Sequence, residues 1–584
     1  DVLGSRGLGD VYKRQLLFNA IWCYYTTFTP FSCWESYATA LAATLVLSVP
    51  YILTRRIAAS ILVMVVLDIW MVANLLYYRS YFSAIPLSSY LLAGNLTDFL
   101  PSVAASFRWC DGLFPASTAA VVFFMLWRNH RSKIIFPFGK HAYFTLLIFL
   151  CALLAVNLSI RGGFLTVYRN MKSSAHRHAS GPPLYTLFGT LYFDYADELP
   201  ELTEEQEHEI HNWLSERPAL VPVPDIASRD NCIFILAESL ESWVLNLTVE
   251  NQEITPYLNK LLKERSTLYA PHVLTQVNGG RSIDAQLLVL AGLLPLQTGA
   301  YSCRFPLNTY HTLPKAMKEL KGTRNYLLTV DKTKTWNQGA VARSFGIDTI
   351  VSYPDFRMTE AFGNRKRLGD NAFFSQCREK MENGEIWRSD ENVFIQMVTY
   401  SGHSPFKMPE SLKTVHFSNR IPEVMADYMT VAHYTDEAIG KFVEYLRTRP
   451  EYGRTMVVIT GDHEGLADNR KDLCRTKAGK GIVSENEFTP FIVLNSPIAM
   501  YHTKVMGQVD IYTTLLNLLG LESYRWSGIG QSILDSGKPG IAISPKRSIE
   551  GDTMFLSREE LLRMRQSQVI SDRIIRFDKL KDLR

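Results

Sequence analysis

The chain has 584 residues, of which 47% are hydrophobic and 20% charged, and its formal net charge is +4. This length allows several domains of about 100–200 residues each, and so small a net charge does not indicate a nucleic-acid partner. The eight cysteines have no CxxC spacing, which excludes a cysteine-based zinc framework. Apolar residues concentrate before about Arg161, so the sequence predicts a membrane half followed by a soluble half.

Residues 1–15 have no initiator methionine and form no signal-peptide pattern, so we interpret them as non-native, adapter-derived residues. Residues 16–160 form a predicted transmembrane domain of about five helices, because a helix needs about 20 apolar residues to cross a bilayer. The predicted spans are Leu16–Trp34, Ser36–Leu53, Ile57–Tyr78, Leu113–Trp127 and Ala142–Ile160. Asp68 inside the third span is costly in lipid, so we expect it to face the bundle or a polar partner.

Lysine and arginine residues mark the loops after the second and fourth predicted spans. By the positive-inside rule these loops are cytoplasmic, so five spans leave the rest of the chain on the outer side. The sequence therefore predicts a multi-pass protein of the bacterial cytoplasmic membrane with an extracytoplasmic soluble part. Residues 161–230 contain a short helix pattern and then several prolines, which is typical of a juxtamembrane connector.

From residue 231 onward, short apolar runs alternate with helix-like stretches, a pattern typical of a mainly parallel sheet with helices on both faces. The predicted strands are Asn231–Ala237, Asn325–Val330, Val393–Val398, Thr455–Thr460 and Phe491–Asn495. The predicted helices are Thr255–Glu264, Leu313–Leu320, Gly369–Glu382, Asp427–Arg447 and Val509–Leu519. We predict an α/β catalytic domain over residues 231–540 and a charged helical tail over residues 541–584.

Four polar residues stand where predicted strands end or a helix begins: Glu238, Ser282, Asp462 and His463. In open α/β sheets the ligand crevice lies at this edge. Three oxygen donors and one imidazole suit Mn²⁺, Mg²⁺ or Zn²⁺ better than a thiophilic metal. Taken singly, each of these residues is more often a cap or part of a solvated turn than a ligand, but their joint placement favours a site for one divalent metal.

Ser282 follows two glycines and precedes an apolar helix that extends to Gly292. A helix N-terminus presents free N–H groups and positive potential, which favour an anion such as phosphate. Ser282 is therefore either a nucleophile, whose hydroxyl a bound metal would activate, or simply the N-cap of the helix.

Five segments, AESLES, GGRSIDA, DKTKTWN, TYSGHSPF and TGDHEG, follow one another along the soluble half. In their order and approximate spacing they resemble lipoteichoic acid synthases and related phosphoglycerol transferases, a family of the alkaline phosphatase/sulfatase superfamily. The resemblance covers Leu16 to about Leu534. It implies an N-terminal α-helical transmembrane bundle followed by a sulfatase-like α/β domain, with one divalent metal, Mn²⁺ before Mg²⁺ or Zn²⁺.

The resemblance also implies roles for particular residues. Glu238, Asp462 and His463 match the metal ligands of the family, and Ser282 stands where the family has a threonine nucleophile that also touches the metal. Three further residues match positions that line the lipid headgroup site: Asp331, Trp336 and His403. From its position alone, His403 is more typical of a turn residue than of a functional one. Gln338 stands where the family has an arginine, which puts the identity of the headgroup in doubt.

The reaction implied by the resemblance transfers a phosphoglycerol-type headgroup from a membrane phospholipid to a glycan or glycolipid through a phospho-Ser282 intermediate. A phosphoethanolamine transferase or a phosphoester or sulfuric ester hydrolase of the same superfamily is an alternative, and a non-catalytic membrane sensor is another. Formylglycine formation is not expected, because the segment Ser282–Gln286 lacks the proline and arginine that a sulfatase has there.

Overall fold

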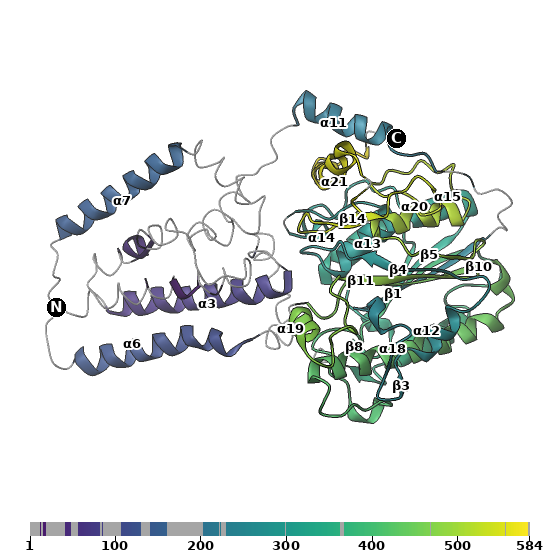
Figure 1. Ribbon diagram of the computed structural model, residues 1–584, viewed down its shortest axis with the longest axis horizontal. Helices are drawn as coiled ribbons and strands as arrows, with labels where there is room; N and C mark the ends of the chain where they lie inside the picture. Colours follow the sequence, from purple (N-terminus) through teal and green to yellow (C-terminus); the bar gives the residue numbers. More distant parts are fainter. Residues whose placement is uncertain are drawn as a thin grey trace. The chain divides into compact units, whose positions relative to one another are not determined.

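The computed structural model describes residues 57–81, 85, 107–129, 140–160, 202–220, 222 and 229–581 except 298, 334, 363–366, 468 and 555, together with residues 12, 16–18, 21, 41, 43–47 and 49. The chain forms two compact units. One comprises Asp1–Gly94 and Val103–Glu198, and the other comprises Asn95–Ser102 and Leu199–Arg584. Figure 1 labels the helices and strands of both units.

The first unit contains three long helices at the positions of the third, fourth and fifth predicted spans. They are α3 (Ile57–Tyr81), α6 (Leu113–Asn129) and α7 (Lys140–Ile160). Asp68 of α3 is buried and accepts a hydrogen bond from the hydroxyl of Thr118 in α6, so it has the polar partner expected of it. Within the described ranges, no helix has both the length and the apolar character that crossing a membrane requires. The five-span anchor stays a prediction, and its first two spans lie largely outside the described residues.

The second unit is built on a nine-stranded sheet in the order β12-β4-β11-β10-β1-β9-β5-β6, with β13 also paired to β4. The strands from β10 to β6 in this order are mutually parallel, whereas β11 runs antiparallel to both β10 and β4. The parallel strands are β10 (Thr455–Gly461), β1 (Asn231–Ala237), β9 (Val393–Val398), β5 (Arg324–Thr329) and β6 (Thr349–Val351). The others are β4 (Leu268–Leu274), β11 (Phe488–Leu494), β12 (Met500–Tyr501) and β13 (Met506–Gly507). The predicted mainly parallel sheet is confirmed.

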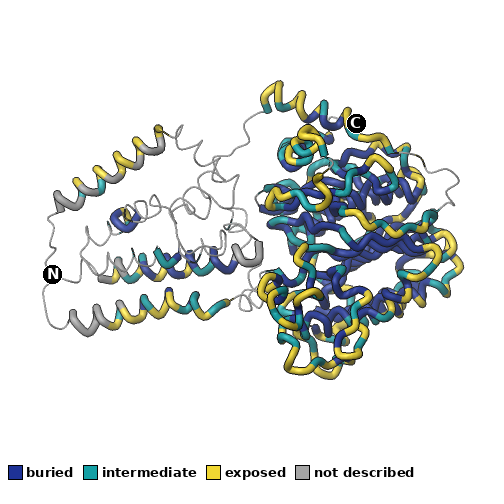
Figure 2. The backbone as a smooth tube through the Cα atoms, viewed as in Figure 1, coloured by how far each residue is buried: buried dark blue, intermediate teal, exposed yellow. Residues whose placement is uncertain are grey.

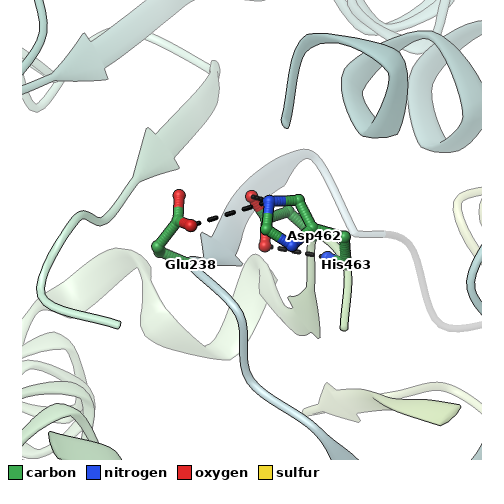
Figure 3. A group of neighbouring side chains, drawn as sticks. All are labelled: Glu238, Asp462 and His463. Carbon is green, nitrogen blue, oxygen red and sulfur yellow. Dashed lines mark hydrogen bonds and ion pairs between the residues drawn. The ribbon is translucent and has the colours of Figure 1, made fainter. Parts of the chain in front are cut away.

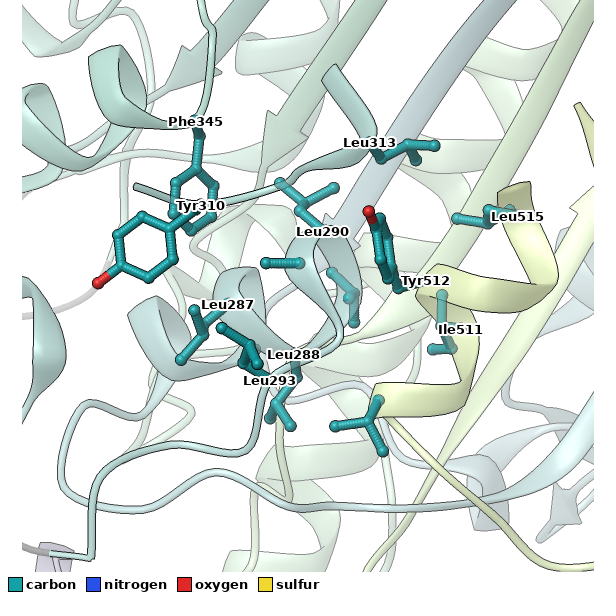
Figure 4. Packing of buried hydrophobic residues seen from close by; sticks show 14 of the residues in the cluster. Leu287, Leu288, Leu290, Leu293, Tyr310, Leu313, Phe345, Ile511, Tyr512 and Leu515 are labelled. Carbon is teal, nitrogen blue, oxygen red and sulfur yellow. The ribbon is translucent and has the colours of Figure 1, made fainter. Parts of the chain in front are cut away.

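Helices cover both faces of this sheet, and the side chains of β1 show why. Cys232, Phe234 and Leu236 point into one buried apolar cluster, and Ile233 and Ile235 into another, because successive side chains of a strand alternate between faces. The first cluster contains residues of α13 (Ser282–Ala291), α15 (Leu313–Lys321) and α20 (Val509–Leu518), whose packing appears in Figure 4. The second contains residues of α12 (Pro256–Leu261), α17 (Asp370–Glu382) and α18 (Glu423–Thr448). All seven residues of β1 are therefore buried, as the dark tube at the centre of the sheet in Figure 2 illustrates.

The ends of the second unit differ in part from the predicted elements. Residues 541–584 contain a hairpin of β14 (Ile541–Ile543) and β15 (Ile549–Gly551) before the long helix α21 (Arg558–Arg576). Of the predicted connector, the structure describes α11 (Glu204–Ser215), whose Ile210, Trp213 and Leu214 are buried in the same cluster as α13. α11 therefore contributes to the core of the catalytic unit.

The carboxyl ends of β1, β9, β10 and β5 share one edge of the sheet, because parallel strands end on the same side. Glu238 follows β1, Asp462 and His463 follow β10, and His403 and Asp331 lie in the segments after β9 and β5. The fold thus brings the segments that carry the predicted site to one edge.

Asp436 of α18 gives the fold a pH dependence that can be tested. Its carboxylate accepts hydrogen bonds from the backbone N–H groups of Tyr257 (2.9 Å) and Leu258 (2.7 Å) in α12. Burial nevertheless raises the pKa of Asp436 to about 7. Between its ordinary pKa of about 3.9 and this value, the folded state holds a proton that the unfolded state has released, so its contribution to stability falls as the pH rises.

We expect the free energy of unfolding of the wild type to fall more steeply between pH 5 and about 7 than that of Asp436→Asn. The difference in slope should approach about 1.4 kcal/mol per pH unit, the limit for one proton. Urea denaturation of both purified proteins across this range measures it. Parallel slopes would show that Asp436 keeps an ordinary pKa.

Candidate metal centre and nucleophile

Glu238, Asp462 and His463 converge at the edge of the sheet, as Figure 3 shows. One potential ligand atom from each lies within 4.8 Å of the other two, and all three residues are buried. His463 Nε2 is 3.6 Å from Glu238 Oε1 and 3.4 Å from Asp462 Oδ2. Residues more than 200 positions apart in the chain therefore form one compact cluster.

The register of two parallel strands places the two carboxylates next to each other. Ala237, the last residue of β1, pairs with Gly461, the last residue of β10, so Glu238 and Asp462 leave the sheet side by side. Ser239 then turns the chain with a φ of 56°, and its backbone N–H donates to Asp462 Oδ1 at 2.7 Å. Asp462 Oδ1 also accepts from the backbone N–H of His463 at 2.8 Å, which fixes the carboxylate in orientation.

These three side chains fit a divalent cation. Asp462 Oδ2 is a buried oxygen that accepts no hydrogen bond from the described residues, although its partner oxygen accepts two. Burial, and then the nearby charge of Asp462, raise the pKa of the Glu238 carboxyl well above its usual range, a cost that a cation between the carboxylates would relieve. Burial also lowers the pKa of His463, which favours the neutral imidazole that ligates metals.

The two ring nitrogens of His463 have different neighbours. His463 Nδ1 lies 2.9 Å from the carbonyl oxygen of Glu464, which can only accept, and 3.1 Å from Arg281 Nη2, which can only donate. Nε2 faces Glu238, Asp462 and Ser282, so it is the ring nitrogen directed toward the predicted metal site. A metal-ligating histidine usually donates its other ring N–H to such a carbonyl.

Ser282 lies against this cluster. Its Oγ is 3.4 Å from Glu238 Oε2 and 3.3 Å from His463 Nε2. Ser282 is the first residue of α13, and the N-cap position belongs to Arg281, so the interpretation of Ser282 as a simple N-cap is wrong. The hydroxyl instead faces the predicted metal ligands.

Asp284 holds the turn that presents Ser282. Its Oδ2 accepts hydrogen bonds from the backbone N–H groups of Asn278 (3.0 Å) and Gly280 (2.8 Å). A Cβ at Gly280 would lie 2.2 Å from Asp284 Oδ1, so only glycine allows this approach. Burial raises the pKa of Asp284 to about 7. The position of Asp284 in the first turn of the helix could have indicated that it binds backbone N–H groups there. It could not have indicated that the donors are Asn278 and Gly280.

The predicted headgroup residues lie in three other segments. Asp331 pairs with Arg367 at 2.8 Å, and its charge contributes to the raised pKa of Glu238. Trp336 lies in a short 3-10 helix, Thr335–Asn337, with a φ of 52°. His403 is half-buried and stacks on the ring of Tyr400, with centroids 5.2 Å apart. Their contact with a headgroup stays a prediction.

The sulfatase family profile matches residues 230–521, which is half of the chain. The chain belongs to the sulfatase family. The profile of the lipoteichoic acid synthase N-terminal domain matches residues 24–169, over most of the predicted transmembrane domain. The resemblance stated from the sequence motifs is thereby confirmed.

The chain is 24% identical over 488 residues to the lipoteichoic acid synthase of Staphylococcus aureus (strain USA300), and the match covers 80% of this chain and 73% of that protein. Among solved structures, the lipoteichoic acid synthase LtaP from Listeria monocytogenes has 18% identity and a TM-score of 0.50, covering 63% of this chain and 98% of that one. An alkaline phosphatase superfamily protein from Vibrio parahaemolyticus has 16% identity and a TM-score of 0.49, covering 65% and 97%. The chain is an enzyme of the sulfatase superfamily, similar to lipoteichoic acid synthase.

The sulfatase-family site also has supporting residues that the sequence motifs did not single out. Gln508 donates its amide to the carbonyl oxygen of Asp462 at 2.7 Å. Tyr428 donates its hydroxyl to the carbonyl oxygen of Ser239 at 2.7 Å and accepts from the backbone N–H of Glu241 at 3.0 Å. Gln508 precedes α20 and Tyr428 lies within α18, and no sequence pattern links either to the strand ends.

Replacing Glu238 by glutamine separates metal binding from folding. We expect Glu238→Gln without metal to be at least as stable as the wild type, because it removes a buried charge beside Asp462. Mn²⁺ at about 100 times its dissociation constant should stabilise the wild type by about 2.7 kcal/mol and the variant far less. Thermal denaturation with and without Mn²⁺ measures both effects.

Glu444→Gln is the matched control, since Glu444 lies in an exposed ion pair with Lys260. It should keep the full response to Mn²⁺. An equal Mn²⁺ response in Glu238→Gln would show that Glu238 is no ligand.

Proposed function

We propose that this protein is a membrane-anchored, metal-dependent phosphotransferase that moves a phosphoglycerol-type headgroup from a phospholipid to a glycan or glycolipid acceptor. The observation that carries the proposal is the position of Ser282: its hydroxyl lies at a helix N-terminus within 3.4 Å of both Glu238 and His463. A nucleophile beside three convergent metal ligands is the arrangement that phosphoryl transfer through a covalent intermediate requires.

The similarity to known proteins supports the choice of substrate class. The Staphylococcus aureus relative is a lipoteichoic acid synthase, and the profile of the lipoteichoic acid synthase N-terminal domain matches residues 24–169 of this chain. A multi-pass anchor of about five helices would hold the catalytic unit at the outer face of the bacterial cytoplasmic membrane. There it meets lipid headgroups continually, which raises their effective concentration.

In the first step, the Ser282 oxygen attacks the phosphorus of the donor lipid. The Ser282 O–P bond forms while the P–O bond to diacylglycerol breaks; the departing oxygen takes up a proton, and the proton of the serine passes to solvent. A divalent cation held by Glu238, Asp462 and His463, Mn²⁺ in our proposal, would lower the pKa of the Ser282 hydroxyl and offset the phosphate charge. The start of α13 has no side-chain cap, so its N-terminus would favour the negative charge of the phosphate.

In the second step, an acceptor hydroxyl attacks the phosphorus, and Ser282 regains its proton as its bond to phosphorus breaks. His403 is proposed to stabilise charge on the phosphate oxygens or the leaving group, and Asp331 and Trp336 to contact the headgroup. The acceptor sugar occupies the same side of the site as the departed diacylglycerol.

A phosphoethanolamine donor is the second candidate, and Gln338 is the observation that favours it. Gln338 is buried at the start of α16 (Gln338–Ser344), where the family has an arginine. A neutral amide there offers no charge to a phosphate and accepts hydrogen bonds as well as donating them.

The test is intact-mass and peptide mass spectrometry of the purified protein after incubation with Mn²⁺ and phosphatidylglycerol. We expect a glycerophosphate adduct on Ser282 that is absent from Ser282→Ala, because alanine has no hydroxyl to form the ester. Ser536→Ala, a change at an exposed serine, serves as the control and should react like the wild type.

The donor lipid is varied in a parallel reaction. An adduct from phosphatidylethanolamine alone would replace the proposed headgroup by the second candidate. Rapidly quenched samples that show no adduct from either lipid would contradict the covalent mechanism.

A further inference from the structure

Arg281 and Glu464 are adjacent in sequence to two residues of the site, the proposed nucleophile and a proposed metal ligand. Arg281 immediately precedes Ser282, and Glu464 immediately follows His463. Neither has a role in the mechanism proposed above, yet the structure joins them. Arg281 Nη1 donates to Glu464 Oε1 at 2.5 Å, and the two side chains are 18% and 2% exposed.

A second contact connects the same guanidinium to the main chain. Arg281 Nη2 donates to the carbonyl oxygen of Glu464 at 3.1 Å, and it also lies 3.1 Å from His463 Nδ1. Arg281 therefore binds both the side chain and the backbone of Glu464. The residue next to the nucleophile thereby contacts both the ring of His463 and the carbonyl that lies 2.9 Å from this ring.

The backbone of Arg281 has an unusual conformation, which indicates that contacts with surrounding residues hold it in place. Its φ is 49° and its ψ is −120°, a region that non-glycine residues rarely occupy. Such a conformation is strained and persists only where the surroundings determine it. Here Asp284 fixes the preceding turn through Gly280, and Glu464 fixes the Arg281 side chain.

We propose that Arg281 and Glu464 form a clamp that sets the distance between the nucleophile and the metal ligands. In this Arg281–Glu464 clamp both residues are positioning residues: they fix Ser282 Oγ against His463 Nε2 and keep this nitrogen directed into the metal site. The inference rests on the proposed function, in which Ser282 is the nucleophile and His463 a ligand.

A competing role for Arg281 is direct contact with the donor phosphate, and Glu464→Gln separates the two. The variant keeps the positive charge of Arg281 but weakens the contact between Arg281 and residue 464. A phosphate-binding arginine would then be freer to bind substrate, whereas a clamp would lose its effect on the metal site.

The experiment measures Mn²⁺ binding to the metal-free full chain by calorimetry and single-turnover formation of the Ser282 adduct. For Glu464→Gln we expect Mn²⁺ affinity to fall by about 10-fold or more, as for other groups that orient metal ligands. The adduct rate constant should fall while the donor concentration at half-maximal rate stays within about twofold. Arg281→Lys, which keeps the charge but not the two-point contact, should lie between Glu464→Gln and the wild type.

Glu451→Gln is the matched control, because Glu451 pairs with Arg449 at 3.2 Å in a similarly buried setting before β10, at the opposite end of this strand from Glu464. It should leave Mn²⁺ affinity unchanged. In the double variant Arg281→Gln/Glu464→Gln, the loss of affinity should be smaller than the product of the two single losses, since both changes break one unit.

Unchanged Mn²⁺ affinity in Glu464→Gln, or an equal loss in Glu451→Gln, would overturn the clamp while leaving the proposed function intact. In Glu464→Gln, a fall in the donor concentration at half-maximal rate, with an unchanged rate constant and unchanged Mn²⁺ affinity, would also overturn it and assign Arg281 to phosphate binding. A wild-type protein that binds no Mn²⁺ would overturn the proposed function together with the clamp.

Discussion

The parallel pairing of β1 with β10 is the constraint on which the site depends. It sets Ala237 opposite Gly461, so the two chains leave the sheet together and deliver Glu238 and Asp462 into one buried space. Two carboxylates this close repel each other in a medium of low polarity, and the raised pKa of Glu238 reports that cost. The two carboxylates stay close because the strand register is fixed along the whole sheet. A cation bound between them would offset their repulsion, so the site favours cation binding.

The proposed nucleophile, Ser282, lies at the start of α13, and helix packing and polar contacts position it. α13 packs against α20 in the apolar layer of Figure 4, which fixes the helix as a whole. At its start, Asp284 and the strained Arg281 shape the turn, so that Ser282 faces the carboxylates while free N–H groups remain for an anion. Rigid packing supplies the coarse position of the hydroxyl, and a few buried polar contacts supply the fine one.

Sequence patterns predicted the fold where apolar periodicity dominates and failed where tertiary pairing decides. β1 and β9 begin and end at the predicted residues, since each is a mostly apolar run. β4 was missed because it contains Pro271, which argues against a strand; in the structure the pairing of β4 with β11 is irregular at this point, so the missing N–H is tolerated. Motifs located the three candidate ligands and Ser282. The contact between Arg281 and Glu464 joins loops 183 residues apart, and no local pattern specifies it.

We propose that Glu238, Asp462, His463 and Ser282 surround one divalent cation. Anomalous diffraction from crystals of the protein grown with Mn²⁺ can test this arrangement. We expect a single strong anomalous peak within bonding distance of Glu238, Asp462 Oδ2, His463 Nε2 and Ser282 Oγ. A peak elsewhere in the catalytic unit, or none at this cluster when Mn²⁺ is saturating, would contradict it.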